Sequence, residues 1–134
     1  MKTPEVRTPI QKRFADIDIF RHVNNVAQQG YFDVGKSDYF ARVLRCDLME
    51  LRPMIVTVST STSYMGQVRH DDDIEVVTRT LKVGNKSITL HQRLLCGEEV
   101  RSESTSVMVA FDYAGQVSVG VPDWWRARLL GEEK

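Results

Sequence analysis

Two carboxylates, one imidazole and two amides stand together in Asp16-Ile17-Asp18-Ile19-Phe20-Arg21-His22-Val23-Asn24-Asn25, a run of ten residues. Directly after it, residues 25–45 are predicted to form one long helix with Asn24 or Asn25 as its N-cap. The first N–H groups of a helix have no partner inside it, and they lie at the positive end of its dipole. A carboxylate beside such a helix start suits acyl-transfer chemistry, because a carbonyl oxygen becomes negative during that reaction.

The predicted helix carries a stripe of mostly small side chains. Gly30, Val34, Ser37, Ala41 and Leu44 recur at spacings of three and four, which places them on one helical face. Small side chains allow another surface to come close to the backbone. We therefore expect the fold to wrap closely around this face.

After Pro53 the apolar pattern changes to a period of two, which is typical of strands. An extended segment is predicted at 6–17, strands at 56–64, 73–83, 87–96, 99–111 and 116–119, and a C-terminal helix from 122. This order predicts an α+β fold in a single domain, residues 1–134, with the long helix on one face of an antiparallel sheet. Such a sheet leaves edges and one face unpaired, so we expect a homodimer or homotetramer.

The composition limits the classes of partner. Eighteen basic and eighteen acidic residues give a net charge of zero, which argues against a nucleic-acid or anionic-membrane binder. Cys46 and Cys96 match no metal-ligand spacing, and no apolar run approaches the ~18 residues of a membrane span. The first residues contain no apolar secretion signal. The sequence thus predicts a cytoplasmic protein with no metal, nucleic-acid or membrane partner.

The run from Asp16 to Asn25, followed by Tyr31-Phe32-Asp33, resembles the hotdog-fold thioesterases. The likeness is to the branch with 4-hydroxybenzoyl-CoA thioesterase, short-chain acyl-CoA thioesterases and plant acyl-ACP thioesterases, which share D-x-D-x-x-G-H-V-N-N before an aromatic-rich helix start. It implies a long central helix wrapped by an antiparallel sheet of roughly five to six strands. In two places the chain departs from this pattern: Arg21 replaces a glycine, and Gln28 replaces a common tyrosine.

The resemblance also implies an activity. The protein would hydrolyse acyl-CoA or acyl-carrier-protein thioesters to a free acid and a thiol. It would need no cofactor, because CoA or phosphopantetheine enters as part of the substrate. The expected partners are therefore a small-molecule acyl thioester and an acyl carrier protein, which carries the same thioester bond on its phosphopantetheine.

By the same resemblance, Asp18 is the catalytic carboxylate, which either attacks the thioester carbonyl or activates a water molecule. His22 and Asn24 would position the reactants, and the backbone N–H near Asn25 would bind the oxyanion. Asp33 stands where relatives often carry a glutamate, and it would assist the reaction or hold the loop. Without the resemblance these residues have ordinary structural interpretations, because aspartate and asparagine commonly cap turns and helix starts.

Four residues are predicted to touch the substrate. Ser59 and Ser61 belong to a polar row on one strand which, by the resemblance, borders the acyl pocket across the dimer. The same row is typical of a solvated sheet surface. Arg21 and Arg69 are candidates for contact with the phosphates or the pantetheine arm of the carrier.

Asp16 is interpreted as a structural residue. It alternates with Asp18 in a segment predicted to be extended, so the two side chains would point in opposite directions. We expect Asp16 to accept structural hydrogen bonds or to lie on the surface.

Two other functions stay open on the sequence alone. A non-catalytic module that binds acyl-CoA or an acyl carrier is favoured by Arg21 in place of glycine. A hydratase or dehydratase of acyl thioesters on the same fold usually carries D-x-x-x-x-x-H, whereas Asp18 and His22 are four residues apart.

Overall fold

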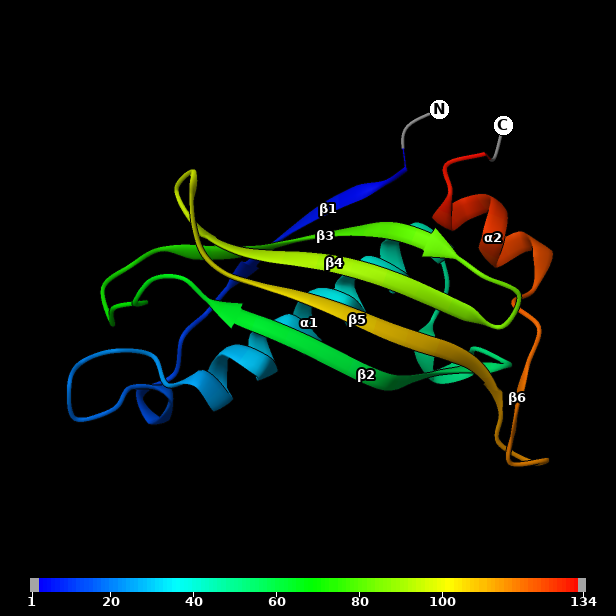
Figure 1. The fold of residues 1–134 in the computed structure, drawn as a ribbon, viewed down its shortest axis with the longest axis horizontal. Helices are drawn as coiled ribbons and strands as arrows, with labels where there is room; N and C mark the ends of the chain where they lie inside the picture. The colour runs from blue at the N-terminus through cyan, green and yellow to red at the C-terminus, as the bar shows by residue number, and fades with distance from the viewer. Residues whose placement is uncertain (1–2, 133–134) are drawn as a thin grey trace.

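Six strands form one antiparallel sheet that curves around a long helix (Figure 1). The computed structural model describes residues 3–132. The helices are α1 (Asn25–Leu44) and α2 (Asp123–Leu129), with short 3-10 helices at Phe14–Asp16 and Leu48–Glu50. The strands are β1 (Glu5–Ile10), β2 (Met54–Tyr64), β3 (Ile74–Val83), β4 (Ser87–Cys96), β5 (Glu99–Asp112) and β6 (Val117–Val119).

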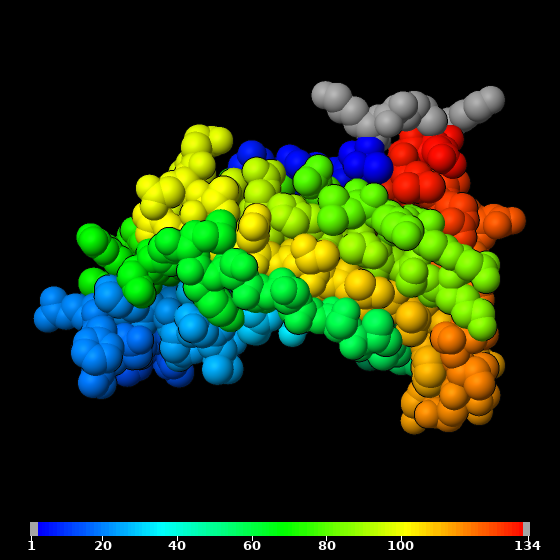
Figure 2. Space-filling view, in the orientation of Figure 1, coloured from blue at the N-terminus to red at the C-terminus, as the bar shows by residue number. Residues whose placement is uncertain are grey.

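The strand order is β1-β3-β4-β5-β2, and β6 extends the sheet by pairing with the end of β5. α1 lies along one face of the sheet, while α2 lies beside one end of it (Figure 1). The other face of the sheet carries no helix, and β2 (green) forms a free edge of it (Figure 2). This is the hotdog arrangement that the resemblance predicts, so the α+β prediction is confirmed.

The core has two parts, one under each half of α1. Under the first half, buried apolar side chains come from the loops, α1, β3 and β4: Val23, Tyr31, Phe32, Val68, Ile74, Val76 and Leu94. Under the second half, α1, the central strands and α2 supply the larger group: Tyr39, Phe40, Val43, Leu44, Leu51, Ile88, Leu90, Met108, Ala110, Val121, Trp125 and Leu129. Burial of this apolar surface holds α1 on the sheet.

The face of α1 that meets the sheet differs from the predicted one. Gly30, Val34 and Ser37 are exposed, so the wrapping expected on the small-residue stripe is wrong for most of its length. The buried face instead contains Gly35, where an added Cβ would meet Val76 Cγ1 at 2.6 Å. The periodicity identified a face of small residues, but the larger side chains decide burial because they remove more apolar surface from water.

The predicted extended segment at 6–17 ends early. β1 stops at Ile10, and Phe14–Asp16 forms a turn of 3-10 helix. The Asp16 carboxylate accepts a hydrogen bond from the Arg13 N–H at 3.0 Å and so closes this turn. A side chain that bonds nearby backbone in this way competes with the extended conformation.

Candidate functional site

The loop before α1 is organised by the Asp18 carboxylate. Its Oδ1 accepts hydrogen bonds from the Phe20 N–H at 2.9 Å and the His22 N–H at 3.2 Å. The backbone N–H of Asp18 in turn donates to the His22 carbonyl at 2.9 Å. Oδ2 of this exposed side chain has no hydrogen bond among residues 3–132. One oxygen therefore shapes the loop, and the other is open to a reactant.

Arg21 lies at a tight turn of this loop. Its φ is 66°, in the left-handed region that favours glycine. The Arg21 N–H donates to the Asp18 carbonyl at 3.0 Å, which closes the turn that φ requires. Arg21 therefore adopts a backbone conformation for which glycine, the residue of the family pattern, is best suited.

A second segment, 67–70, fixes the loop from the other side. The Val23 N–H donates to the Val68 carbonyl at 2.7 Å, and His22 and Arg69 form an isolated antiparallel bridge. The His70 N–H donates to the Arg21 carbonyl at 3.1 Å. The fold thereby brings Arg69 next to Arg21 and His22, from which it is far apart in the sequence.

The start of α1 offers free donors. Asn24 is the N-cap: its Oδ1 accepts from the Ala27 N–H at 2.7 Å, and its own N–H donates to the Asp16 carbonyl at 3.0 Å. The next two amides, of Asn25 and Val26, have no acceptor within the described part of the chain. Two adjacent N–H groups at the positive end of a helix can hold a developing oxyanion.

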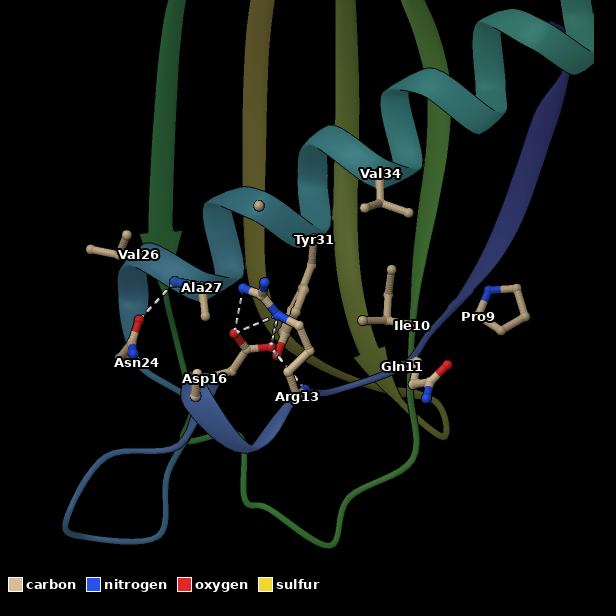
Figure 3. A pocket seen from close by; sticks show the side chains of 12 residues that line it. Pro9, Ile10, Gln11, Arg13, Asp16, Asn24, Val26, Ala27, Tyr31 and Val34 are labelled. Atoms are coloured by element: carbon tan, nitrogen blue, oxygen red, sulfur yellow. Dashed lines mark hydrogen bonds and ion pairs between the residues drawn. The ribbon is translucent and has the colours of Figure 1, made fainter.

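Asp16 is buried in a compact network beside this helix start (Figure 3). Its carboxylate accepts from the Tyr31 hydroxyl at 2.6 Å and from Arg13 Nη2 at 2.9 Å. Burial by itself would raise the pKa of Asp16, but the hydrogen bonds from Arg13 and Tyr31 outweigh it and lower the pKa to about 2. Burial and the hydrogen bond to Asp16 raise the pKa of Tyr31. The structural interpretation of Asp16 is confirmed.

A cavity of about 680 Å³ opens next to this network, between the first half of α1 and the end of β1 (Figure 3). A Cβ added at Gly30 would meet nothing within 4 Å, so the glycine contributes to this space. The lining residues are Pro9, Ile10, Gln11, Arg13, Ala15, Asp16, Asn24, Val26, Ala27, Gly30, Tyr31 and Val34. Asn24 alone among the predicted catalytic residues lines this cavity, whereas Asp18 and His22 lie in the neighbouring loop.

The other flank of the helix start is β2. Gln29 Nε2 donates to Thr62 Oγ1 at 2.9 Å and to the Tyr64 hydroxyl at 2.8 Å. The Tyr64 hydroxyl also reaches the Asn25 carbonyl at 3.4 Å. The end of β2 is therefore in contact with the helix start.

A β-bulge in β2 decides which side chains face α1. The register shifts between Thr57 and Ser59, after which Thr60 and Thr62 pair with the buried Ser106 and Ser104 of β5. Ser59 and Ser61 consequently lie on the opposite face of the sheet within this chain. The fold does not bring these two serines to the helix start, and threonines stand there instead.

Asp33 lies away from the loop. It is eight residues into α1, about 12 Å along the helix axis from Asn25. Its side chain is exposed, and its carboxylate pairs with Lys36 Nζ at 3.4 Å. The structure therefore does not bring Asp33 to Asp18.

Several residues of this region escaped the sequence analysis. Gln28, noted in the sequence only as a departure from the family pattern, is buried, and its Oε1 accepts from the Ser102 hydroxyl at 2.8 Å. Arg13 was not singled out, although its partner Asp16 is only three residues away, and Gly30 was assigned to the small-residue stripe without a role in a cavity. Tyr31 was quoted in the resemblance without a role.

Within 3–132, no group of three or more His, Cys, Asp or Glu side chains could hold a metal ion. Neither helix in that range has the length and hydrophobicity needed to cross a bilayer.

A family model described as the thioesterase-like superfamily matches residues 13–129 of the chain. Among curated proteins, the uncharacterized protein YsmA of Bacillus subtilis is 31% identical over 94 residues, which cover 70% of this chain. The same residues cover 61% of YsmA, so the chain spans about three fifths of that relative.

Solved structures share the fold over nearly all of the chain. The PA5185 protein of Pseudomonas aeruginosa is 26% identical, with a TM-score of 0.85 over 94% of this chain and 90% of that one. A Thermus thermophilus thioesterase, solved in complex with coenzyme A and Zn, is 24% identical, with a TM-score of 0.83 over 95% and 98%. The latter likeness supports the fold alone.

Proposed function

The chain belongs to the thioesterase-like superfamily, and from that premise we propose that it hydrolyses acyl-CoA thioesters with Asp18 as nucleophile or general base. One observation carries the proposal. The open Oδ2 of Asp18 belongs to the loop that leads into a helix start with two unpartnered amides. A base or nucleophile and an oxyanion site are the two groups that thioester hydrolysis requires.

In the proposed reaction the amides of Asn25 and Val26 bind the thioester carbonyl oxygen. Asp18 then either attacks the carbonyl carbon or removes a proton from the attacking water. The carbon–sulfur bond breaks, the thiolate leaves, and an acid is released; direct attack first forms a mixed anhydride that water hydrolyses. His22 and Asn24 hold the loop and the helix start in place.

The carrier of the acyl group is proposed to be CoA. The Thermus thermophilus thioesterase binds coenzyme A, and the present chain has two exposed arginines, Arg21 and Arg69, at the loop. Their guanidinium groups suit phosphate oxygens. An acyl carrier protein, which presents the same phosphopantetheine thioester, is the second candidate carrier.

We further propose that the protein acts as a homodimer joined through β2. This strand is a free edge of the sheet, and Val58 at its bulge is 57% exposed. Antiparallel pairing with a second copy would satisfy its unpaired backbone groups. In this pairing the first residues of one β2 would lie beside the last residues of the partner's β2. They would therefore also lie near the start of the partner's α1, which the end of β2 contacts.

The test is release of free thiol from a panel of acyl-CoA thioesters. We expect turnover by the wild-type protein and a loss of about 100-fold or more in kcat for Asp18→Asn. Asp71→Asn, which neutralises an exposed loop carboxylate, is the matched control and should keep full activity. Tight binding of acyl-CoA without thiol release would instead identify a binding module.

A further inference from the structure

A second cavity, of about 260 Å³, lies between the second half of α1 and the start of β2. We call it the Lys36 pocket. Its polar lining is Asp33, Lys36, Ser37 and Thr57, and the rest is apolar, with Phe40 and Met108 from the core. An apolar cavity with a few convergent polar groups is typical of a small-molecule site.

Lys36 is unusual among the lysines of residues 3–132 because it is only 8% exposed. Its one partner among residues 3–132 is the Asp33 carboxylate at 3.4 Å, and the Asp33 side chain is 74% exposed. An ammonium group has three N–H donors, and a buried charge is costly unless it is paired and hydrogen-bonded. Lys36 Nζ can therefore donate hydrogen bonds to an anion that enters the pocket. The anion would replace the solvated Asp33 carboxylate as the partner of Lys36.

The pocket lies too far from the proposed oxyanion site for the reacting carbonyl group. Only the far end of a bound acyl chain could reach it. Lys36 lies about 16 Å along α1 from Asn25 of its own chain. In the proposed dimer a shorter route exists. Thr57 from the first half of β2 lines the pocket, and Tyr64 at its end touches the helix start. Antiparallel pairing of two β2 strands would bring the Lys36 pocket of one copy next to the helix start of the other.

We propose that the Lys36 pocket binds the far end of the acyl group and that Lys36 recognises a carboxylate there. The inference rests on the proposed thioester hydrolysis and names its substrate class: half-thioesters of dicarboxylic acids. The apolar wall takes the methylene chain, while the ammonium of Lys36 and the hydroxyls of Ser37 and Thr57 donate to the carboxylate. The volume accommodates about eight or nine water-sized groups at ~30 Å³ each.

The test compares two CoA thioesters of equal chain length, suberyl-CoA with a terminal carboxylate and octanoyl-CoA with a terminal methyl group. We expect the wild-type protein to have the higher kcat/KM for suberyl-CoA. Lys36→Met should lower the ratio of kcat/KM for suberyl-CoA to that for octanoyl-CoA by roughly 10- to 100-fold, the range of a charged hydrogen bond. Lys36→Arg should keep most of the preference.

Two further variants sharpen the readout. Lys82→Met removes an exposed lysine on β3 and should leave the ratio of the two kcat/KM values unchanged. Asp33→Asn removes the competing carboxylate and should increase the ratio. Any effect of Asp33 on the chemical step changes kcat/KM for both substrates equally, since both share that step. Such an effect therefore leaves the ratio of the two kcat/KM values unchanged.

The outcomes separate the two claims. Hydrolysis of both thioesters at equal kcat/KM by the wild-type protein overturns the inference and leaves the proposed function in place. Failure to hydrolyse any thioester of the panel overturns the proposed function itself. If Lys36→Met does not fold, as judged by its thermal melt, the wild-type ratio and the effect of Asp33→Asn decide the matter.

Discussion

Arg21 adopts a backbone conformation that most side chains avoid, and its φ of 66° costs about 1–2 kcal/mol for an L-residue other than glycine. The hydrogen bonds of the loop hold it there, since its N–H and its carbonyl are both used. The sequence analysis noted the departure from glycine. Only the fold shows that Arg21 adopts a positive φ.

This conformation leads to a prediction for two variants that both remove the guanidinium. Arg21→Gly should be more stable than Arg21→Ala by about 1 kcal/mol, because glycine accepts a positive φ without steric cost. Urea unfolding of the two variants measures the difference. Equal stability would mean that Arg21 does not hold this φ in solution.

The Asp16 carboxyl has an ordinary pKa of 3.8 and a pKa of about 2 in the fold. The unfolded chain therefore takes up a proton at a higher pH than the folded chain does. The contribution of Asp16 to stability is complete above about pH 5 and is lost as the pH falls toward 2. Urea unfolding between pH 7 and pH 2 should show that the free energy of unfolding falls less steeply with pH in Asp16→Asn than in the wild-type protein. An unchanged slope would contradict the role assigned to its hydrogen bonds.

At the scale of the element, α1 contains two glycines in opposite environments. A Cβ at Gly35 would meet Val76 Cγ1 at 2.6 Å and Gln92 Nε2 at 3.0 Å, whereas a Cβ at Gly30 would meet nothing within 4 Å. Both positions gain about 1 kcal/mol of helix propensity on change to alanine, but overpacking at Gly35 costs about 1–3 kcal/mol.

We therefore expect opposite results from the same substitution. Gly30→Ala should raise the free energy of unfolding by about 1 kcal/mol, and Gly35→Ala should lower it by up to about 2 kcal/mol. Chemical denaturation followed by circular dichroism tests the pair. A stabilising Gly35→Ala would show that α1 lies further from β3 than described.

At the scale of the whole molecule, β2 forms one open edge of the sheet, where backbone groups have no partner strand. Val58→Lys should place like charges near each other in the proposed dimer and weaken self-association by about tenfold or more. Val117→Lys, at an exposed position on β6, is the matched control. Sedimentation velocity measures both, and an unaffected dimer in Val58→Lys would exclude β2 as the interface.

Much of the molecule was predictable from local patterns. The helix at 25–45, the strands after Pro53 and the helix-capping role of Asn24 follow from periodicity and capping preferences, which act over a few residues. The loop from Asp16 to Asn25 was recognisable by its density of polar side chains and by the family pattern, which are both local properties of the sequence. The roles of Asp18, His22, Asn25 and Asp33 in catalysis stay predictions.

Tertiary structure alone decided what depends on distant partners. Packing against β3 and β4 sets which face of α1 is buried. A bulge in β2, opposite β5, sets the face of the sheet on which Ser59 and Ser61 lie. The Asp16–Tyr31 bond and the Lys36 pocket each join elements that no short-range pattern connects. By itself, the sequence determined which elements form and where the chemistry is concentrated, because those are local properties of the chain. The faces that meet, and hence the cavities, were decided by packing between elements, where burial of large side chains outweighs any local pattern.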